Sequence, residues 1–311
     1  MRRVSPKLEG WLEEYNRILN DLLEQGFKPS VENTRKGLAD LTRNLVTDCP
    51  TIAWVEDDWI HAPHGAVPIR IYHPTPDVGL PVLIYYHGGG HMAGSVEVYD
   101  PICRKLARRV RHVVVSVEYR LAPENPYPAG VQDAYAAAEH VWDALDRNTL
   151  NYRQRLSIAG DSGGGALCAT VAHQSQQDQA VQIDNQVLIY PSLYYTLAWP
   201  SLDINGVGYL LEKDKILWYF DHYFQSDENR SDASPLYMAV TSELPRTLVV
   251  TAEFCPLRDE GAAYVKRLGD MGVQVEQLHF DDMIHAFLNM EDVTPEACDA
   301  VYQAISRFLE D

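Results

Sequence analysis

The stretch RLSIAGDSGGGALCATVAHQ, residues 155–174, decides the fold of this chain. Its apolar segment Leu156–Ala159 predicts a buried strand, and the small residues from Gly164 to Gln176 predict a helix. Between them stands Gly160-Asp161-Ser162-Gly163-Gly164, a GxSxG pattern. A serine on such a strand-to-helix turn exposes its Oγ beside backbone N–H groups, and the flanking glycines permit the turn. The alternative is an ordinary serine in a glycine-rich turn.

Short apolar runs and longer helical stretches alternate on both sides of this turn. This alternation predicts an α/β fold with a mostly parallel central sheet flanked by helices on both faces. The expected strands are 51–60, 66–72, 82–86, 112–117, 156–159, 186–190, 247–251 and 273–279. The expected helices are 6–25, 31–45, 96–110, 131–145, 164–176, 258–271 and 295–309. The aromatic-rich residues 192–235 interrupt the rhythm, and we expect them above the strand ends, where such sheets bind ligands.

The composition restricts the class of protein. The 311 residues include 26 Lys and Arg against 44 Asp and Glu, a formal net charge of −18. We therefore expect no nucleic-acid partner and no basic membrane anchor. No apolar stretch approaches the ~18 residues of a membrane span, and glutamates replace the apolar run of a signal peptide near the N-terminus. The five cysteines form no CxxC pair, so we expect a reduced, cytoplasmic protein without a disulfide framework or a metal site.

Two further motifs carry chemistry. His87-Gly88-Gly89-Gly90 directly follows the apolar run PVLIYY, and three consecutive glycines can present main-chain N–H groups to a developing oxyanion. The alternatives are a phosphate-binding loop or a plain turn, but no GxGxxG or GKS/T pattern is present. His285 follows the last expected strand, and serine, then an acid, then histidine is the chain order of the α/β-hydrolases.

Several ordered motifs together resemble one family. They are HGGG (87–90), EYRLAPENPYPA (118–129), GDSGG (160–164), ASPL (233–236), CPLRDEG (255–261) and IHAF (284–287). They are similar to those of the hormone-sensitive-lipase-like esterases, which include the bacterial acetyl esterases. The resemblance covers about residues 50–311 and implies an α/β-hydrolase fold with a helical cap. It implies hydrolysis of short-chain carboxylic esters, with Ser162 as nucleophile and His285 as base. It also implies Gly88, Gly89 and Gly163 as oxyanion-hole donors.

One position departs from the family pattern. The family has its triad aspartate at the start of DPLRDEG, where this chain has Cys255. A neutral thiol is a weak acceptor, so it neither fixes the histidine tautomer nor stabilises the imidazolium well. In the serine-protease template, neutralising the acid lowers kcat about 10⁴-fold, and we expect slow turnover unless another carboxylate serves. The first candidate is Asp259, about one helical turn along, and the second is Glu253. Asp281 and Asp282, shortly before His285, are further candidates, and Cys255 with no substitute acid stays open as well.

The sequence thus predicts a serine carboxylesterase with an atypical triad. We expect an N-terminal helical cap segment at 1–48 and a hydrolase domain at 49–311, with a cap insertion at about 192–232. The substrate pocket is predicted to include His91, Met92, Tyr194, Tyr209 and Leu210, although His91 also fits a partly exposed loop residue. The expected partner is a small-molecule ester with no cofactor, and the resemblance allows a homodimer. The alternative function is a catalytically impaired, ligand-binding protein on the hydrolase fold, as the resemblance to plant gibberellin receptors implies.

Overall fold

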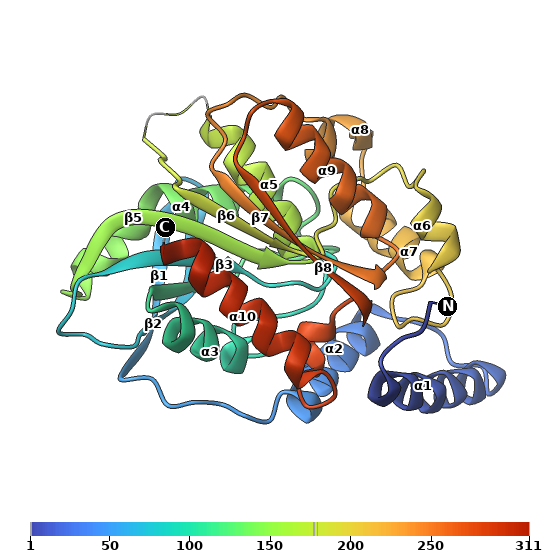
Figure 1. Ribbon diagram of the computed structural model, residues 1–311. Coiled ribbons are helices and arrows are strands. Elements are labelled where there is room, and N and C mark those ends of the chain that lie inside the picture. Colours follow the sequence, from blue (N-terminus) through green and yellow to red (C-terminus); the bar gives the residue numbers. More distant parts are fainter. Residues whose placement is uncertain (1, 177, 179, 311) are drawn as a thin grey trace.

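A single eight-stranded sheet forms the centre of the molecule (Figure 1). The computed structural model describes residues 2–176, 178 and 180–310. The strand order across the sheet is β1-β2-β4-β3-β5-β6-β7-β8. The strands are β1 (Trp54–Ala62), β2 (Gly65–His73), β3 (Leu80–Tyr86), β4 (Val113–Val117), β5 (Tyr152–Asp161), β6 (Asn185–Ile189), β7 (Arg246–Phe254) and β8 (Val275–Ile284).

The sheet is mostly parallel, as the sequence predicts. β2 pairs antiparallel with both of its neighbours, β1 and β4. The neighbouring strands in the remaining order β4-β3-β5-β6-β7-β8 all pair in parallel. Helices cover both faces of the central strands, which are therefore mostly apolar, and all five residues of β4 are buried. Since parallel strands end at the same edge, the loops that follow β3, β5, β7 and β8 meet there.

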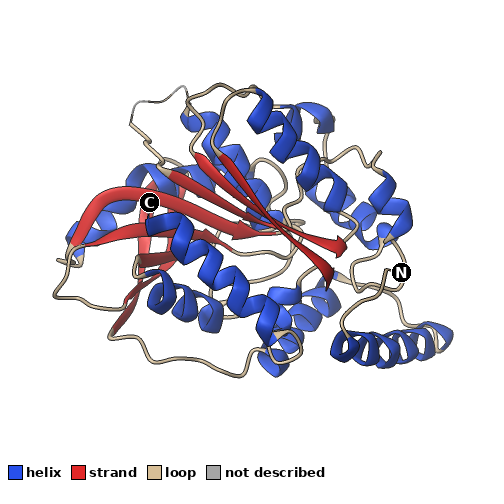
Figure 2. Cartoon of the chain, in the orientation of Figure 1, coloured by secondary structure: helices blue, strands red, loops and turns tan. Residues whose placement is uncertain are grey.

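Helices form a layer on each face of the sheet (Figure 2). Successive side chains of a strand point to opposite faces, so Leu83 and Tyr85 join one core while Val82, Ile84 and Tyr86 join the other. The first core includes α3 (Asp100–Val110) and α10 (Pro295–Glu310). The second includes α4 (Ala129–Arg147), α5 (Gly163–Ser175) and α9 (Arg258–Asp270).

A helical cap lies beyond the carboxyl ends of the strands (Figure 1). It contains the N-terminal helices α1 (Pro6–Glu24) and α2 (Val31–Leu45). The segment between β6 and β7 contributes the helices α6 (Pro200–Ile204), α7 (Lys213–Tyr223) and α8 (Arg230–Ala233). Leu8 and Leu12 of α1 are buried in the core that includes α3 and α10. The short 3-10 helices are η1 (Pro235–Tyr237) and η2 (Phe287–Met290). In the described part of the chain, no helix combines the length and apolar character needed to cross a membrane.

Several predicted boundaries shift, among them the start of β5, at Tyr152 rather than residue 156, and two of the shifts have local reasons. The helix expected from residue 96 begins at Asp100, because residues 96–99 form turns in which Val96 N–H donates to the Glu118 carboxylate. The last strand extends to Ile284 rather than to residue 279. Its polar Asp281 and Asp282 are tolerated because β8 is an edge strand with exposed positions.

Candidate active site

Ser162 stands on a tight turn between β5 and α5. Its backbone has φ 53° and ψ −118°, a conformation that non-glycine residues rarely adopt. A Cβ on Gly164 would lie 1.9 Å from the Tyr86 carbonyl oxygen, and a Cβ on Gly160 would lie 2.5 Å from Gly164. Neither position admits a side chain, so the glycines let α5 pack directly against the strands. The predicted strand-to-helix turn is confirmed.

His285 follows β8 and faces this serine. Its Nε2 lies 2.8 Å from Ser162 Oγ, and its side chain is buried. Burial, with a smaller contribution from the Lys215 ammonium, lowers the imidazole pKa to about 3. The imidazole is therefore neutral at neutral pH, the state in which Nε2 can take a proton from the hydroxyl.

Cys255 lies on the other side of the imidazole, directly after β7. Its Sγ is 3.1 Å from His285 Nδ1, and Leu257 N–H donates to the same sulfur over 3.3 Å. The thiol is 1% exposed, and burial raises its pKa, so it is protonated at neutral pH. A neutral thiol either accepts from Nδ1–H or donates its S–H to Nδ1. Only the first arrangement leaves the Nε2 lone pair facing the serine.

The two first-ranked carboxylates have other partners. Asp259 accepts a hydrogen bond from Ser201 N–H over 2.8 Å and pairs with Arg258 at 2.8 Å. Glu253 pairs with Arg2 at 2.6 Å and with Arg258 at 2.9 Å. Both carboxylates therefore bind other groups, and the hydrogen-bond partner of His285 Nδ1 is the Cys255 sulfur.

Asp281 and Asp282, near the end of β8, have exposed side chains. Asp281 lies 3.5 Å from His279 Nε2 with a side chain that is 97% exposed. The Asp282 side chain lines a pocket beside the start of α1, and its backbone carbonyl accepts a hydrogen bond from Ser5 N–H. The structure therefore brings neither carboxylate to the Ser162–His285 pair.

Side chains of α6 and of the residue that follows it hold the turn that carries Cys255. The buried Asn205 amide donates to the carbonyls of Glu253 and Cys255 over 2.9 and 3.0 Å. Ser201 Oγ donates to the Pro256 carbonyl over 2.7 Å. Arg2 adds a hydrogen bond to the Asn205 side chain over 2.9 Å. The position of the sulfur thus depends on side chains from α6 and from the N-terminal segment.

The oxyanion-hole prediction needs one correction, at Gly88. Its N–H donates to the Asp161 carboxylate over 2.7 Å and is therefore not free to meet an oxyanion. The next two glycines have positive φ, 126° at Gly89 and 62° at Gly90. A Cβ on Gly163 would lie 3.3 Å from Gly90 N, so these two backbones lie side by side. Gly89, Gly90 and Gly163 are therefore the candidate donors, with Gly90 in place of Gly88.

Asp161 holds this glycine loop in place through a hydrogen bond to Gly88 N–H. Its Oδ1 accepts hydrogen bonds from Tyr85 OH over 2.9 Å and from Gly88 N–H over 2.7 Å, and its Oδ2 accepts one from Tyr99 OH over 3.0 Å. Burial raises the carboxyl pKa to about 6, and these hydrogen bonds oppose the rise. One side chain next to the serine therefore anchors both the turn and the loop that faces it.

His91 is buried, so the expectation of a partly exposed loop histidine is wrong. It is 2% exposed with φ 61°. Its ring stacks on Tyr223 at 4.0 Å between centroids, and its Nε2 lies 3.2 Å from Tyr195 OH. Burial lowers its pKa to about 3. The aromatic insertion covers this histidine, which a sequence pattern around residue 91 does not reveal.

Two predicted pocket residues are packed into the protein. Met92 is fully buried, and its carbonyl accepts a hydrogen bond from the Arg35 guanidinium over 2.9 Å. Tyr194 packs against Trp199 and Tyr237, in the core that includes α4, α5 and α9. Met92 thus links the glycine loop to α2 of the cap, whereas Tyr194 supports the base of the insertion.

The other two predicted pocket residues, Tyr209 and Leu210, lie between α6 and α7. Tyr209 packs on Phe254 at 5.1 Å between ring centroids, next to the turn that carries the thiol, and Leu210 is partly buried nearby in the chain. No motif in the sequence singles out Tyr219 of α7. A Cβ on Gly90 would lie 2.7 Å from its ring, so Tyr219 covers the glycine loop. The aromatic content of the insertion is the only sequence signal for this contact.

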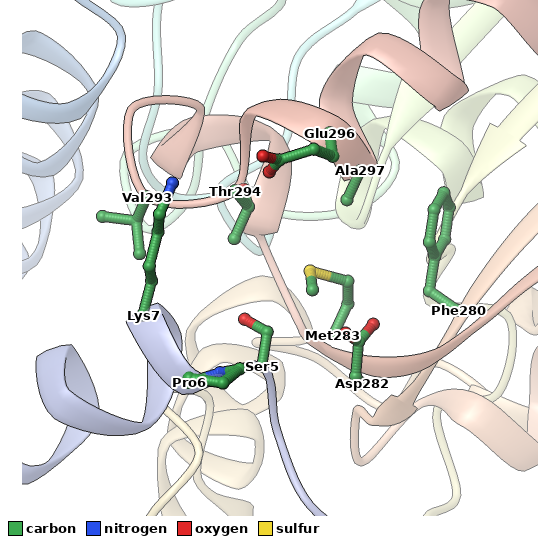
Figure 3. A pocket seen from close by; sticks show the side chains of 10 residues that line it. All are labelled: Ser5, Pro6, Lys7, Phe280, Asp282, Met283, Val293, Thr294, Glu296 and Ala297. Atoms are coloured by element: carbon green, nitrogen blue, oxygen red, sulfur yellow. The ribbon is translucent and has the colours of Figure 1, made fainter.

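Two pockets border the N-terminal helix. One, of about 500 Å³, is lined by residues at the start of α1, the end of β8 and the start of α10, including Lys7, Met283 and Ala297 (Figure 3). The other, of about 320 Å³, lies between the N-terminal segment and residues 207–209 and includes Phe254. The first pocket includes residues of β8, the strand that leads to His285, and the second includes Phe254, the residue before Cys255. Within the described residues, no group of three or more His, Cys, Asp or Glu side chains is placed to hold a metal ion.

Comparisons with known proteins give a consistent result. A family model described as the α/β hydrolase fold matches residues 83–289. Carboxylic ester hydrolase LipN of Mycobacterium tuberculosis is 38% identical over 244 residues, which cover 76% of this chain but only 65% of LipN, less than two thirds of its length. An arylesterase of Saccharolobus solfataricus is 33% identical over 99% of this chain and 98% of its own. The solved hyperthermophilic esterase of Pyrobaculum calidifontis superimposes with a TM-score of 0.84 at 34% identity, covering 99% of this chain and 98% of that one.

Proposed function

This chain belongs to the hormone-sensitive-lipase-like α/β hydrolases, and from that premise we propose that it acts as a carboxylic ester hydrolase through Ser162, His285 and Cys255. The observation that carries the proposal is the line of contacts from Ser162 Oγ to His285 Nε2 at 2.8 Å and from His285 Nδ1 to Cys255 Sγ at 3.1 Å. A hydroxyl is a poor nucleophile by itself, and a neutral imidazole within hydrogen-bond distance activates it.

The reaction proceeds in two halves. Ser162 Oγ attacks the ester carbonyl carbon while its proton passes to His285 Nε2, and the N–H groups of Gly89, Gly90 and Gly163 stabilise the oxyanion. The imidazolium then gives the proton to the leaving alkoxide, which departs as the alcohol. In the second half water attacks the acyl carbon while His285 Nε2 takes a proton from it. The bond from the acyl carbon to Ser162 Oγ then breaks, the imidazolium returns the proton to Oγ, and the acid product is released. The chemistry calls for no cofactor.

Cys255 orients the imidazole but supplies no charge. The neutral sulfur accepts Nδ1–H and so favours the tautomer whose Nε2 is free, a weaker version of the work that a triad aspartate does. It does not stabilise the imidazolium that forms in the transition state. The proposed enzyme is therefore slower than a relative with aspartate at this position.

The substrate class follows from the family and from the cap. We propose short-chain carboxylic esters, as the family resemblance implies, with Tyr219 of α7, whose ring lies against Gly90, as one wall of the substrate pocket. Residues 1–48 and about 192–232 act as the cap on a hydrolase domain at 49–311. β8 is an edge strand of the sheet, and we propose it as the contact surface of a homodimer.

One observation favours a second candidate function. A fully buried, neutral thiol in place of a charged partner is the kind of change that weakens turnover while leaving the binding site whole. The second candidate is therefore a ligand-binding protein that keeps this site and has lost efficient hydrolysis.

Hydrolysis of p-nitrophenyl acetate and butyrate by the purified protein and by Ser162→Ala tests the proposal. We expect the release of p-nitrophenolate to depend on Ser162 and to be inhibited competitively by other small esters. Equal rates for the two proteins would contradict the esterase function. Binding of a non-hydrolysable ester analogue would then support the second candidate.

A further inference from the structure

Lys215 and Tyr219 lie one turn apart on the same side of α7. The Lys215 Nζ stands over the Tyr219 ring at 5.9 Å from its centroid. An ammonium in this position is attracted by the ring face, which limits the range of positions that the flexible side chain samples. Both side chains are partly buried, so the cation is held near the protein rather than in open solvent.

The Tyr219 ring places this cation close to the reacting groups. The ring lies against Gly90, where a Cβ would come within 2.7 Å of Tyr219 Cδ2. Gly90 is one of the proposed oxyanion donors, so one ring separates the donor loop from the ammonium. The field of Lys215 also reaches His285, where it contributes to the lowered pKa of the imidazole.

Two charged residues near Lys215, at the start of α7, have polar partners. Lys213, two residues earlier, pairs with Asp203, and the Glu212 carboxylate accepts a hydrogen bond from Gly208 N–H over 3.3 Å. For Lys215 Nζ, by contrast, the described part of the chain supplies no ion pair and no hydrogen bond. The protein carries a net charge of −18, yet its reacting groups face an ammonium without an acidic partner.

From this arrangement we propose that Lys215 is a specificity-determining residue, and that the preferred substrates are esters with a carboxylate close to the ester group. This inference rests on the proposed esterase function and names its substrate class. The carboxylate belongs either to the acyl part, as in a half-ester of a short dicarboxylic acid, or to the alcohol part. In both cases its partner is the ammonium over Tyr219, which lacks a counterion in the free protein.

The test compares charged and neutral esters of similar size. For the acyl side, ethanol release from monoethyl succinate is compared with that from ethyl pentanoate. For the alcohol side, 4-acetoxybenzoate is compared with 4-acetoxybenzamide. The quantity measured is the ratio of kcat/KM for the charged and the neutral member of each pair. The variant is Lys215→Met. The control is Lys213→Met, which removes another lysine of α7, one that pairs with Asp203 of α6.

Lys215→Met is expected to lower this ratio about tenfold for one of the two pairs, as two unit charges roughly 7 Å apart at a partly screened site would give. Removal of the ammonium should not lower kcat/KM for the neutral esters, because it favours the His285 imidazolium. Lys213→Met should leave both ratios unchanged, and added salt should narrow the difference between charged and neutral esters for the wild type. The pair that responds identifies the side of the ester that carries the charge.

An unchanged ratio in both pairs would overturn the substrate class while leaving Ser162-dependent hydrolysis of the neutral esters, and with it the proposed function, intact. If no ester is hydrolysed, the proposed function fails, and calorimetric titration with monoethyl succinate and ethyl pentanoate then decides the inference by itself. Tighter binding of the anion that is lost in Lys215→Met supports the role of Lys215. Equal affinities overturn it.

Discussion

Replacing Cys255 with aspartate is expected to raise kcat. The sulfur lies 3.1 Å from His285 Nδ1, and a carboxylate oxygen at that distance attracts the imidazolium with about 5 kcal/mol at an effective dielectric constant near 20. Because position 255 is 1% exposed, desolvation of the new carboxylate offsets part of this gain. A net gain of about 3 kcal/mol in the transition state corresponds to roughly a 10²-fold increase in kcat.

The same substitution is expected to move the pH profile. Burial and the Lys215 ammonium hold the His285 pKa at about 3 in the wild type, so the base is lost to protonation only in strong acid. A neighbouring carboxylate favours the imidazolium and raises that pKa. The acidic limb of kcat/KM therefore shifts to higher pH in Cys255→Asp, while the plateau rises.

The assay is p-nitrophenyl butyrate hydrolysis from pH 3 to pH 8, with folding checked by circular dichroism. Cys255→Ser is the matched control, because a hydroxyl can accept Nδ1–H but brings no charge. It should remain within about tenfold of the wild type, a change below 1.4 kcal/mol. A folded Cys255→Asp protein with kcat unchanged or lower at every pH would refute the reasoning about the missing charge.

Three further substitutions test the surroundings of the site. Asp259→Asn should leave kcat within about threefold, less than 1 kcal/mol of barrier, because this carboxylate bonds Ser201 and Arg258; a much larger loss would restore it as the acid. Asn205→Ala removes two hydrogen bonds to the turn that carries Cys255, so the free energy of unfolding measured in urea should fall by ~2 kcal/mol. The factor by which kcat falls should exceed the factor by which KM rises. An unchanged kcat would show that the turn keeps its position without Asn205. Asp161→Ala leaves two tyrosine hydroxyls and one N–H without their buried acceptor, so unfolding should require about 4 kcal/mol less; a loss below 1 kcal/mol in urea titrations would contradict the anchoring role.

The sequence predicts those parts of the molecule that depend on local patterns. The order of strands and helices follows from short apolar runs and small residues. The turn at Ser162 follows from glycines that stand where the structure leaves no space for a Cβ. The His285 contact follows from the order of the motifs along the chain.

The predictions that needed correction depend on contacts across the fold. Asp161 decides which N–H groups of the three consecutive glycines are free, because its carboxylate accepts the hydrogen bond from Gly88 N–H. The position of Asp259 one turn beyond Cys255 suggested a substitute acid, but α9 starts at Arg258 and turns that carboxylate toward α6. Residue spacing along the chain does not predict these two partners, Asp161 for Gly88 and Ser201 for Asp259, because each comes from a distant segment.

The burial of His91 illustrates the same limit. It is enclosed by Tyr195 and Tyr223, more than a hundred residues along the chain, and nothing in its own neighbourhood distinguishes it from a loop residue. Tyr219 reaches the glycine loop in the same way. The aromatic content of the insertion indicates a pocket wall but not which ring meets which glycine.

Trapping of the acyl-enzyme is the sharpest test of Ser162 as the nucleophile. The protein is mixed with p-nitrophenyl butyrate, quenched in acid within the first turnover, digested and analysed by peptide mass spectrometry. We expect a butyryl adduct on Ser162 that is absent in Ser162→Ala, with Cys255 unmodified. An adduct on Cys255 instead of Ser162, or p-nitrophenolate release with no adduct on Ser162, would contradict the proposed mechanism.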